Sequence, residues 1–201
     1  MSKSSDSLRL KLRQETHELH AGLERALDLL SPALVADDYR RLLERFYGFY
    51  NPLEAAMRQA LGGDATEIAT GRWKTPAIAA DLASLGQRPA DVAQLPAASD
   101  VPRLASRADV TGALYVVEGS TLGGAVLSRH FAERWGLTRE HGLAFLHFYG
   151  DQTAAMWQRY LAHLAEFDNE RDAGRVIAAA TATFRALAAW LTTPSAGTPA
   201  A

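Results

Sequence analysis

Residues 112–130 read Gly-Ala-Leu-Tyr-Val-Val-Glu-Gly-Ser-Thr-Leu-Gly-Gly-Ala-Val-Leu-Ser-Arg-His, and this stretch decides the fold. Apolar residues recur at helical spacing up to its midpoint, at Val110, Ala113, Leu114 and Val117. The stretch then carries three glycines within six positions, Gly119, Gly123 and Gly124. Because each glycine inside a helix costs roughly 1 kcal/mol relative to alanine, an ordinary core helix would not hold three so close together.

Gly119 and Gly123 are four residues apart and therefore lie on one face of the predicted helix. A face without side chains lets a neighbour contact the helix backbone, and that neighbour is either another helix or a flat ligand. Glycine and serine also permit a bend, so we expect a kink here. Taken alone, the glycines are explained more simply by a helix-packing contact or by a loop between two helices.

The composition is typical of one globular domain with a full core: 201 residues, 48% hydrophobic and 22% charged. A formal net charge of −2 provides no basic surface for nucleic acid. The absence of cysteine excludes a disulfide, a thiolate nucleophile and a cysteine-ligated metal. The N-terminus lacks the apolar core of a signal peptide, and no apolar run approaches the roughly 18 residues of a membrane span. We therefore expect a cytoplasmic protein with neither membrane nor nucleic-acid partners.

Helical periodicity covers most of the chain, and no segment has the pattern of a strand. The predicted helices span residues 7–30, 36–61, 76–85, 103–135, 151–167 and 171–191, with Ser7 and Asp151 as caps. Residues 1–6 are predicted to be frayed, 64–75 to form a loop, and 86–102 to form short turns. We expect one all-α domain over residues 1–192 and a disordered tail over residues 193–201.

The first predicted helix carries a histidine at the edge of its buried stripe. At about 100° per residue, that stripe comprises Leu8, Leu12, Thr16, Leu19, Leu23 and Leu30. His20 falls about 80° from Leu12, where the core meets solvent. Arg13, His17 and Glu24 lie on the same flank, with Glu24 one turn after His20.

In this position, His20 can ligate iron through one ring nitrogen while Glu24 accepts a hydrogen bond from the other. The alternative is a boundary histidine that bonds to a nearby carbonyl. A di-metal carboxylate bundle requires Glu-x-x-His motifs on two helices, and the sequence contains none. The pair His17-x-x-His20 lacks the carboxylate cluster that would complete a zinc site.

Arginines are the residues expected to meet the acidic groups of a ligand. Arg13 is placed for this role beside His20, although such residues usually form a solvated face. Further candidates are Lys11, Arg40, Arg41 and Arg159. Seven aromatic residues either belong to the core or line a cavity for a large flat cofactor: Phe46, Tyr47, Tyr50, Trp157, Tyr160, Phe184 and Trp190.

Two stretches together resemble the heme oxygenases, in particular the bacterial enzymes found alongside bacteriophytochromes. Residues 12–24, Leu-Arg-Gln-Glu-Thr-His-Glu-Leu-His-Ala-Gly-Leu-Glu, are similar to the family's proximal-helix pattern, in which a glutamate follows the histidine by four positions. Residues 112–124 are similar to the family's kinked distal helix. The order of the two stretches, their separation and the helical layout carry the resemblance over most of the chain.

The resemblance implies a single-domain, all-α fold with heme between a proximal N-terminal helix and a kinked, glycine-rich distal helix. His20 is then the iron ligand and Glu24 its hydrogen-bonding partner. The backbone of Gly119 and Gly123 lies over the heme, and Ser120 belongs to the same catalytic face. Other residues implied at the heme are Arg13, His17, Tyr115, Gly124, Arg159 and Phe184.

The activity implied by the resemblance is oxidative cleavage of heme to biliverdin, CO and iron. Heme is both the substrate and the oxygen-activating cofactor, and O2 and an electron-donor protein or other reductant are co-reactants. A bacteriophytochrome is the candidate recipient of biliverdin. A neutral histidine ligand suits this chemistry, because a thiolate ligand would favour O–O cleavage.

Two departures from the family pattern concern the distal and propionate contacts. Ser120 stands where the animal enzymes have an aspartate that organises distal water, and Arg13 and His17 stand where they have lysines near the heme propionates. A non-catalytic heme-binding or heme-transfer protein remains an alternative, as does a helical interaction module that binds no heme. A thiaminase-like enzyme of related fold would need a cysteine nucleophile, which this sequence lacks.

Overall fold

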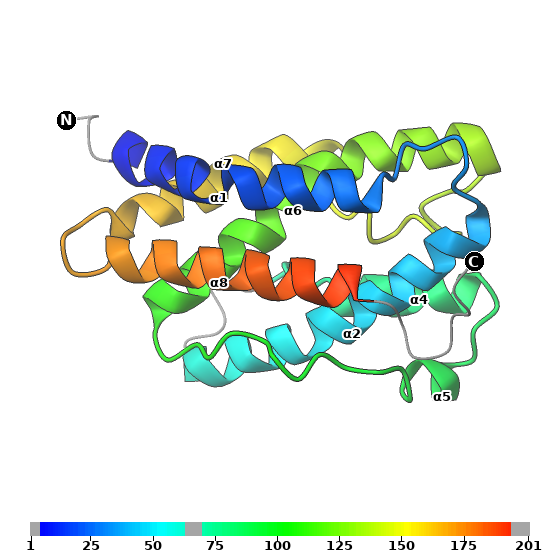
Figure 1. Ribbon diagram of the computed structural model, residues 1–201, viewed down its shortest axis with the longest axis horizontal. Coiled ribbons are helices and arrows are strands. Elements are labelled where there is room, and N and C mark those ends of the chain that lie inside the picture. The colour runs from blue at the N-terminus through cyan, green and yellow to red at the C-terminus, as the bar shows by residue number, and fades with distance from the viewer. Residues whose placement is uncertain (1–4, 63–69, 194–201) are drawn as a thin grey trace.

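The computed structural model describes residues 5–62 and 70–193, and the regular elements in these two ranges are all helical (Figure 1). The long helices are α1 (Ser5–Leu27), α2 (Ala36–Leu61), α6 (Arg107–Trp135) and α8 (Ala173–Thr192). The shorter elements are α4 (Thr75–Ser84), α5 (Pro89–Val92), η2 (Gly150–Gln152), α7 (Thr153–Leu164) and η3 (Ala165–Phe167). The predicted all-α, single-domain class is confirmed.

Helix α6 crosses the bundle and packs on α8, α7 and α2 (Figure 1). Its apolar positions fill the centre of the molecule, with Val110, Ala113, Leu114, Val117 and Phe131 buried. The crossing with α8 is close because of Gly112, where a Cβ atom would collide with the carbonyl oxygen of Val176. This glycine therefore serves helix packing.

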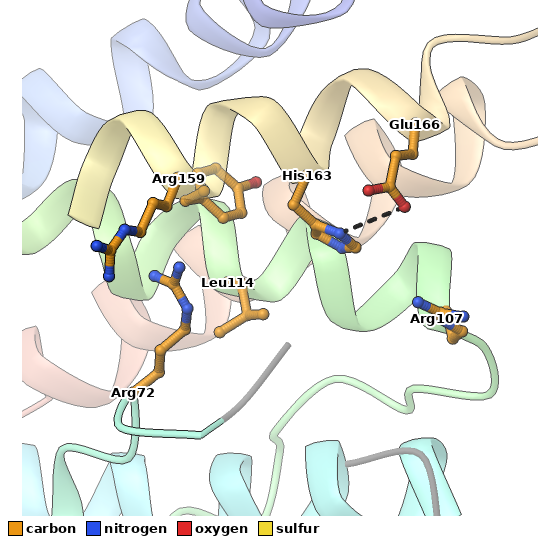
Figure 2. Close-up of a pocket in the computed structure, with 7 residues that line it drawn as sticks. Arg72, Arg107, Leu114, Arg159, His163 and Glu166 are labelled. Atoms are coloured by element: carbon orange, nitrogen blue, oxygen red, sulfur yellow. Dashed lines mark ion pairs between the residues drawn. The ribbon is translucent and has the colours of Figure 1, made fainter. Parts of the chain in front are cut away.

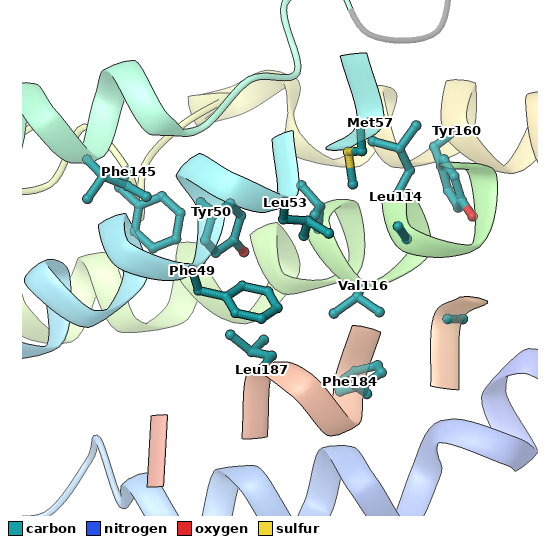
Figure 3. Packing of buried hydrophobic residues seen from close by; sticks show 14 of the residues in the cluster. Phe49, Tyr50, Leu53, Met57, Leu114, Val116, Phe145, Tyr160, Phe184 and Leu187 are labelled. Carbon is teal, nitrogen blue, oxygen red and sulfur yellow. The ribbon is translucent and has the colours of Figure 1, made fainter. Parts of the chain in front are cut away.

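A second set of contacts closes the core around α6. Helix α1 packs on α8 and α7, and α2 packs on α4. Figure 3 shows where these elements meet, around Phe49, Tyr50, Leu53 and Met57 of α2, Leu114 and Val116 of α6, and Phe184 and Leu187 of α8. Burial of such a side chain contributes about 1.5–3 kcal/mol, so this cluster holds α6 and α8 in place.

Two helix ends differ from the sequence prediction for identifiable local reasons. Helix α1 begins at Ser5 and stops at Leu27, because Asp28 adopts a left-handed conformation with φ 38°. Leu30, predicted in the buried stripe, is consequently exposed. Helix α6 begins at Arg107 and not at Arg103, because the Ser106 hydroxyl caps it by accepting a hydrogen bond from the Asp109 backbone N–H.

The other predicted helices lie where the sequence places them. The helix predicted over 151–167 is α7 with a 3-10 turn at each end, so Asp151 lies inside the first turn and does not cap α7. Pro52 lies inside α2. Residues 1–4, the first half of the predicted loop over 64–75 and all of the tail except Thr193 lie outside the described residues.

Helix α6 is long and apolar enough, by length and mean hydropathy alone, to cross a membrane. However, 56% of its most apolar window is buried inside the protein. This burial is the pattern of a core helix, in agreement with the contacts that α6 makes on three sides.

Candidate functional site

Helices α1 and α6 approach each other at Thr16 and Tyr115, whose side chains interact. Both helices run in the same general direction in Figure 1, so one further turn along each leads to His20 and to Gly119. Burial raises the pKa of Tyr115, although Thr16 and the nearby positive charges of Arg9 and Arg13 act in the opposite direction. The contact thus aligns the two predicted motifs and brings Arg13 near Tyr115.

His20 lies at the surface of α1 with its side chain 53% exposed. Its Nδ1 atom is 3.4 Å from the Oε2 atom of Glu24, and its Nε2 atom makes no hydrogen bond to any residue that the structure describes. The edge-to-face contact with Phe184, at 5.8 Å between ring centroids, restrains the imidazole plane. With Nδ1–H directed at a carboxylate, the Nε2 lone pair remains available as a ligand.

One face of α6 is left uncovered by the described part of the protein. It consists of Gly119, Leu122, Gly123 and Val126, which follow the i, i+3, i+4, i+7 spacing of a single helix face. Leu122 and Val126 are 42% and 58% exposed. A Cβ atom at Gly123 would meet nothing within 4 Å, and one at Gly119 would meet only the Trp157 ring, at 4.0 Å. Among the described residues, only the Trp157 side chain of α7 comes near Gly119 and nothing comes near Gly123, so a close helix crossing does not explain these two glycines.

The third glycine of the predicted motif has a different environment. Gly124 is buried, and a Cβ atom there would lie 3.0 Å from the carbonyl oxygen of Leu146. This distance is tighter than an ordinary contact, so Gly124 serves the close approach of the 136–150 segment to α6. The family resemblance implied all three glycines at the heme, whereas the structure places Gly119 and Gly123 on an open face and Gly124 on a packed one.

Ser120 follows Gly119 on the exposed side of α6 and is held by two hydrogen bonds. Its hydroxyl donates to the Val117 carbonyl oxygen at 2.9 Å, so the Tyr50 hydroxyl must be the donor in the 3.3 Å contact between Tyr50 and Ser120. Burial raises the pKa of Tyr50 well above its usual value, which keeps the phenol protonated. A buried donor therefore points at the Ser120 hydroxyl, which lies next to Gly119 of the open face.

The heme oxygenase family model matches residues 6–193. The chain belongs to the heme oxygenase family. A protein named heme oxygenase from Xanthomonas campestris pv. campestris (strain 8004) is 36% identical over 137 residues, covering 65% of this chain and 74% of that protein.

Solved structures agree on the fold. The heme oxygenase of Neisseria meningitidis, determined with NO and CO bound, superposes with a TM-score of 0.73 at 22% identity, over 92% of this chain and 89% of that one. The heme oxygenase of Leptospira interrogans superposes with a TM-score of 0.72 at 20% identity, over 92% and 98% of the two chains.

A buried charge cluster in this heme oxygenase was not predicted from the sequence. Glu118, immediately before Gly119, is fully buried and pairs with Arg72 and with the Lys74 Nζ atom at 3.1 Å. The Tyr149 hydroxyl lies 3.0 Å from the Glu118 carboxylate and 2.9 Å from Lys74 Nζ. Burial lowers the pKa of Lys74 to about 8, against the opposing effect of Glu118. The cluster fixes the turn of α6 that carries Gly119 and Ser120.

Two cluster residues lacked a usable sequence signal. Arg72 and Lys74 precede α4 in an irregular segment, where charged residues are normally solvated. Glu118 directly follows the apolar run at positions 113–117, and a charge at this point of a core helix was the available hint. Trp157, whose ring lies beside Gly119, was noted only as one of several aromatic residues.

The remaining predicted heme residues fall into two groups. Arg13 and His17 are exposed on α1, and Phe184 is buried beneath His20. Arg159 has other neighbours, because it lines a pocket between α6 and α7 together with Arg72 and His163 (Figure 2). The structure thus brings His20, Glu24 and Phe184 together, and Arg13 with Tyr115, but gives Arg159 a separate environment.

Proposed function

We propose that this heme oxygenase cleaves heme to biliverdin, CO and iron with O2 and an external reductant. The observation that carries the proposal is the open glycine face of α6. Helix α6 approaches α1 at Thr16, which is one turn before His20. Because Gly119 and Gly123 have no Cβ, a flat macrocycle has room to lie against this face. The Nε2 atom of His20 is available to bind its iron. Heme, when bound, supplies the O2-activating iron and is itself the substrate.

On the α1 side, His20 holds the iron through Nε2. Glu24 accepts the Nδ1 proton, which fixes the tautomer and makes the opposite nitrogen a stronger donor. Phe184 limits rotation of the imidazole through its edge contact. Because Glu24 is exposed, its hydrogen bond is weaker than a buried one would be, and ligation depends primarily on His20 itself.

On the α6 side, Gly119 and Gly123 leave room for O2 and for ordered water close to the helix backbone. Leu122 and Val126 supply apolar surface that heme would cover. Ser120 takes the polar role, with the Tyr50 phenol donating to its Oγ atom. This pair orients a hydroxyl at the open face and replaces the aspartate of the animal enzymes as the anchor for proton delivery.

At the rim, Arg13 and His17 are the proposed partners of the heme propionates, with Tyr115 beside Arg13. Both side chains are exposed on the flank of α1 that also carries His20. A protein or small-molecule reductant in the cytoplasm is the proposed electron source, and a bacteriophytochrome the proposed recipient of biliverdin. These partner assignments rest on the motif resemblance and not on any contact within the chain.

A heme-transfer protein of the same fold would also need His20 but would have no use for the hydrogen-bonded Ser120 and Tyr50 pair. Titration of the apoprotein with hemin, followed by Soret absorption, tests binding at one equivalent. Addition of ascorbate in air then separates the two functions. The proposal expects loss of the Soret band and growth of the biliverdin band, whereas a stable reduced heme spectrum would favour heme transfer.

A further inference from the structure

The pocket that Arg159 lines has a volume of about 240 Å³ and lies between α6, α7 and the segment that precedes α4 (Figure 2). Its charged lining consists of Arg72, Arg107, Arg159, His163 and Glu166. We propose that this pocket binds a small organic anion through a carboxylate or phosphate group. The site is separate from His20 and from the open face of α6, and it requires no heme.

Among the described residues that line the pocket, the charges do not balance. Three arginines face one carboxylate, that of Glu166. Arg72 is paired with Glu118, but Glu118 also pairs with Lys74, so one buried carboxylate serves two cations. A positive potential in a partly enclosed pocket raises the local concentration of anions.

Arg107 and Arg159 are the side chains available to a ligand. Neither forms an ion pair with any acid in residues 5–62 or 70–193. Figure 2 shows the guanidinium groups of Arg72 and Arg159 at one end of the pocket and that of Arg107 at the other. Arginine presents a planar fork of donors that matches carboxylate and phosphate oxygens in pairs.

His163 lies between these arginines and reports on their charge. Its Nε2 atom is 3.1 Å from the Thr111 hydroxyl, which itself donates to the Arg107 carbonyl oxygen, so Nε2–H is the donor. Its Nδ1 atom is 3.6 Å from the Glu166 carboxylate. Burial lowers the pKa of His163, and Arg107 and Arg72 lower it further, while Glu166 opposes them. A bound anion would offset the arginines and raise this pKa.

The walls of the pocket define the class of ligand. Leu114 and the buried Tyr160 ring add apolar surface beside the arginines. A cavity of this size and mixed lining admits a few carbon atoms in addition to an anionic group. The expected ligand is therefore a small mono- or dianionic metabolite, and neither a polyanion nor a neutral molecule fits the charge.

Binding to the apoprotein tests this proposal independently of heme cleavage. Inorganic phosphate and succinate, each titrated at constant ionic strength, are the probes, and the ring resonances of His163 are followed by NMR, assigned with His163→Gln. At least one anion should give a saturable shift and a higher His163 pKa. Whichever anion binds identifies the headgroup. No saturable shift with either anion would overturn the proposal.

Single variants locate the site. Arg107 and Arg159 lie at opposite ends of the pocket, so at least one of Arg107→Gln and Arg159→Gln should weaken binding by about tenfold, because it removes a charged donor from the end that holds the anion. Arg171→Gln, an exposed arginine outside the pocket, should leave the affinity unchanged. Because Arg107 and Arg159 are exposed, both variants should fold, and thermal melts would verify this. The assignment would be contradicted if both variants bound the anion with unchanged affinity. It would also be contradicted if Arg159→Gln lost affinity for heme but still bound the anion.

Discussion

Replacing Gly123 by leucine separates the two explanations of the glycine motif. A Cβ at this position meets nothing within 4 Å, so the side chain creates no clash in the apoprotein. Leucine is a better helix former than glycine by about 0.8 kcal/mol, which is worth roughly 2–3 °C in melting temperature for a domain of this size. Heme binding should nevertheless be lost, because the isobutyl group occupies the space over the open face of α6.

The matched control is Gly124→Ala, one residue further along. Its Cβ would lie 3.0 Å from the Leu146 carbonyl oxygen, so overpacking of about 1–3 kcal/mol should outweigh the roughly 1 kcal/mol gained in helix propensity and destabilise the apoprotein. Heme affinity and turnover per folded molecule should change little. Thermal melts of both apoproteins, together with hemin titrations, decide the matter. A destabilised Gly123→Leu apoprotein that still bound and cleaved heme would refute the argument.

The other predictions concern the heme ligand, the hydroxyl pair and the buried lysine. His20→Ala should lose the axial ligand and nearly all ring opening, and added imidazole should partly restore a low-spin spectrum; unchanged spectra would redirect the assignment to His17. Glu24→Gln should keep heme but lower the iron–histidine stretching frequency in resonance Raman, and a constant frequency would make Glu24 a surface charge. Tyr50→Phe should leave the Soret titration unchanged and slow turnover by about tenfold, the equivalent of one hydrogen bond of ~1.4 kcal/mol; a normal rate would remove Tyr50 from the proton route. Burial lowers the pKa of Lys74 to about 8 from 10.5, so above pH 8 the unfolded chain binds a proton that the folded chain lacks. The free energy of unfolding should therefore gain a rising contribution between pH 8 and the onset of tyrosine ionisation near pH 10, and Lys74→Met should remove it, as urea titrations at about pH 8 and pH 9 would show.

Periodic apolar spacing predicted the helical fold well because each long helix buries one continuous stripe. In α2, Tyr39, Leu43, Tyr50 and Leu53 follow this spacing and are all buried. Helix ends were less predictable, since single side chains set them. Asp28, in a left-handed conformation, ends α1, and the Ser106 hydroxyl caps the start of α6. The hydrophobic pattern reveals neither of these helix boundaries.

The site was predictable where local spacing determines geometry. His20 and Glu24 are one turn apart on α1, and their side chains do approach each other. Contacts between distant segments were not predictable. The hydrogen bond between Tyr50 and Ser120, and the pairing of Glu118 with Arg72 and Lys74, join elements far apart in the sequence.

The glycines show the same distinction within one helix. Spacing correctly placed Gly119 and Gly123 on a common face, and the structure leaves that face open. It could not reveal that Gly124 and Gly112 face protein backbone, because this depends on where Leu146 and Val176 come to lie. This glycine-rich stretch thus combines positions that serve packing with positions on an open face.

The most direct test of the central claim is a product balance for heme bound to the purified protein. One equivalent of hemin, an excess of reductant and O2 should yield about one biliverdin, one CO and one iron per heme, measured by absorption, gas analysis and iron chelation. The same reaction with His20→Ala should yield none of them beyond the level of free hemin. A reduced heme that persists in air with the wild-type protein, or equal yields from the wild type and His20→Ala, would contradict the account.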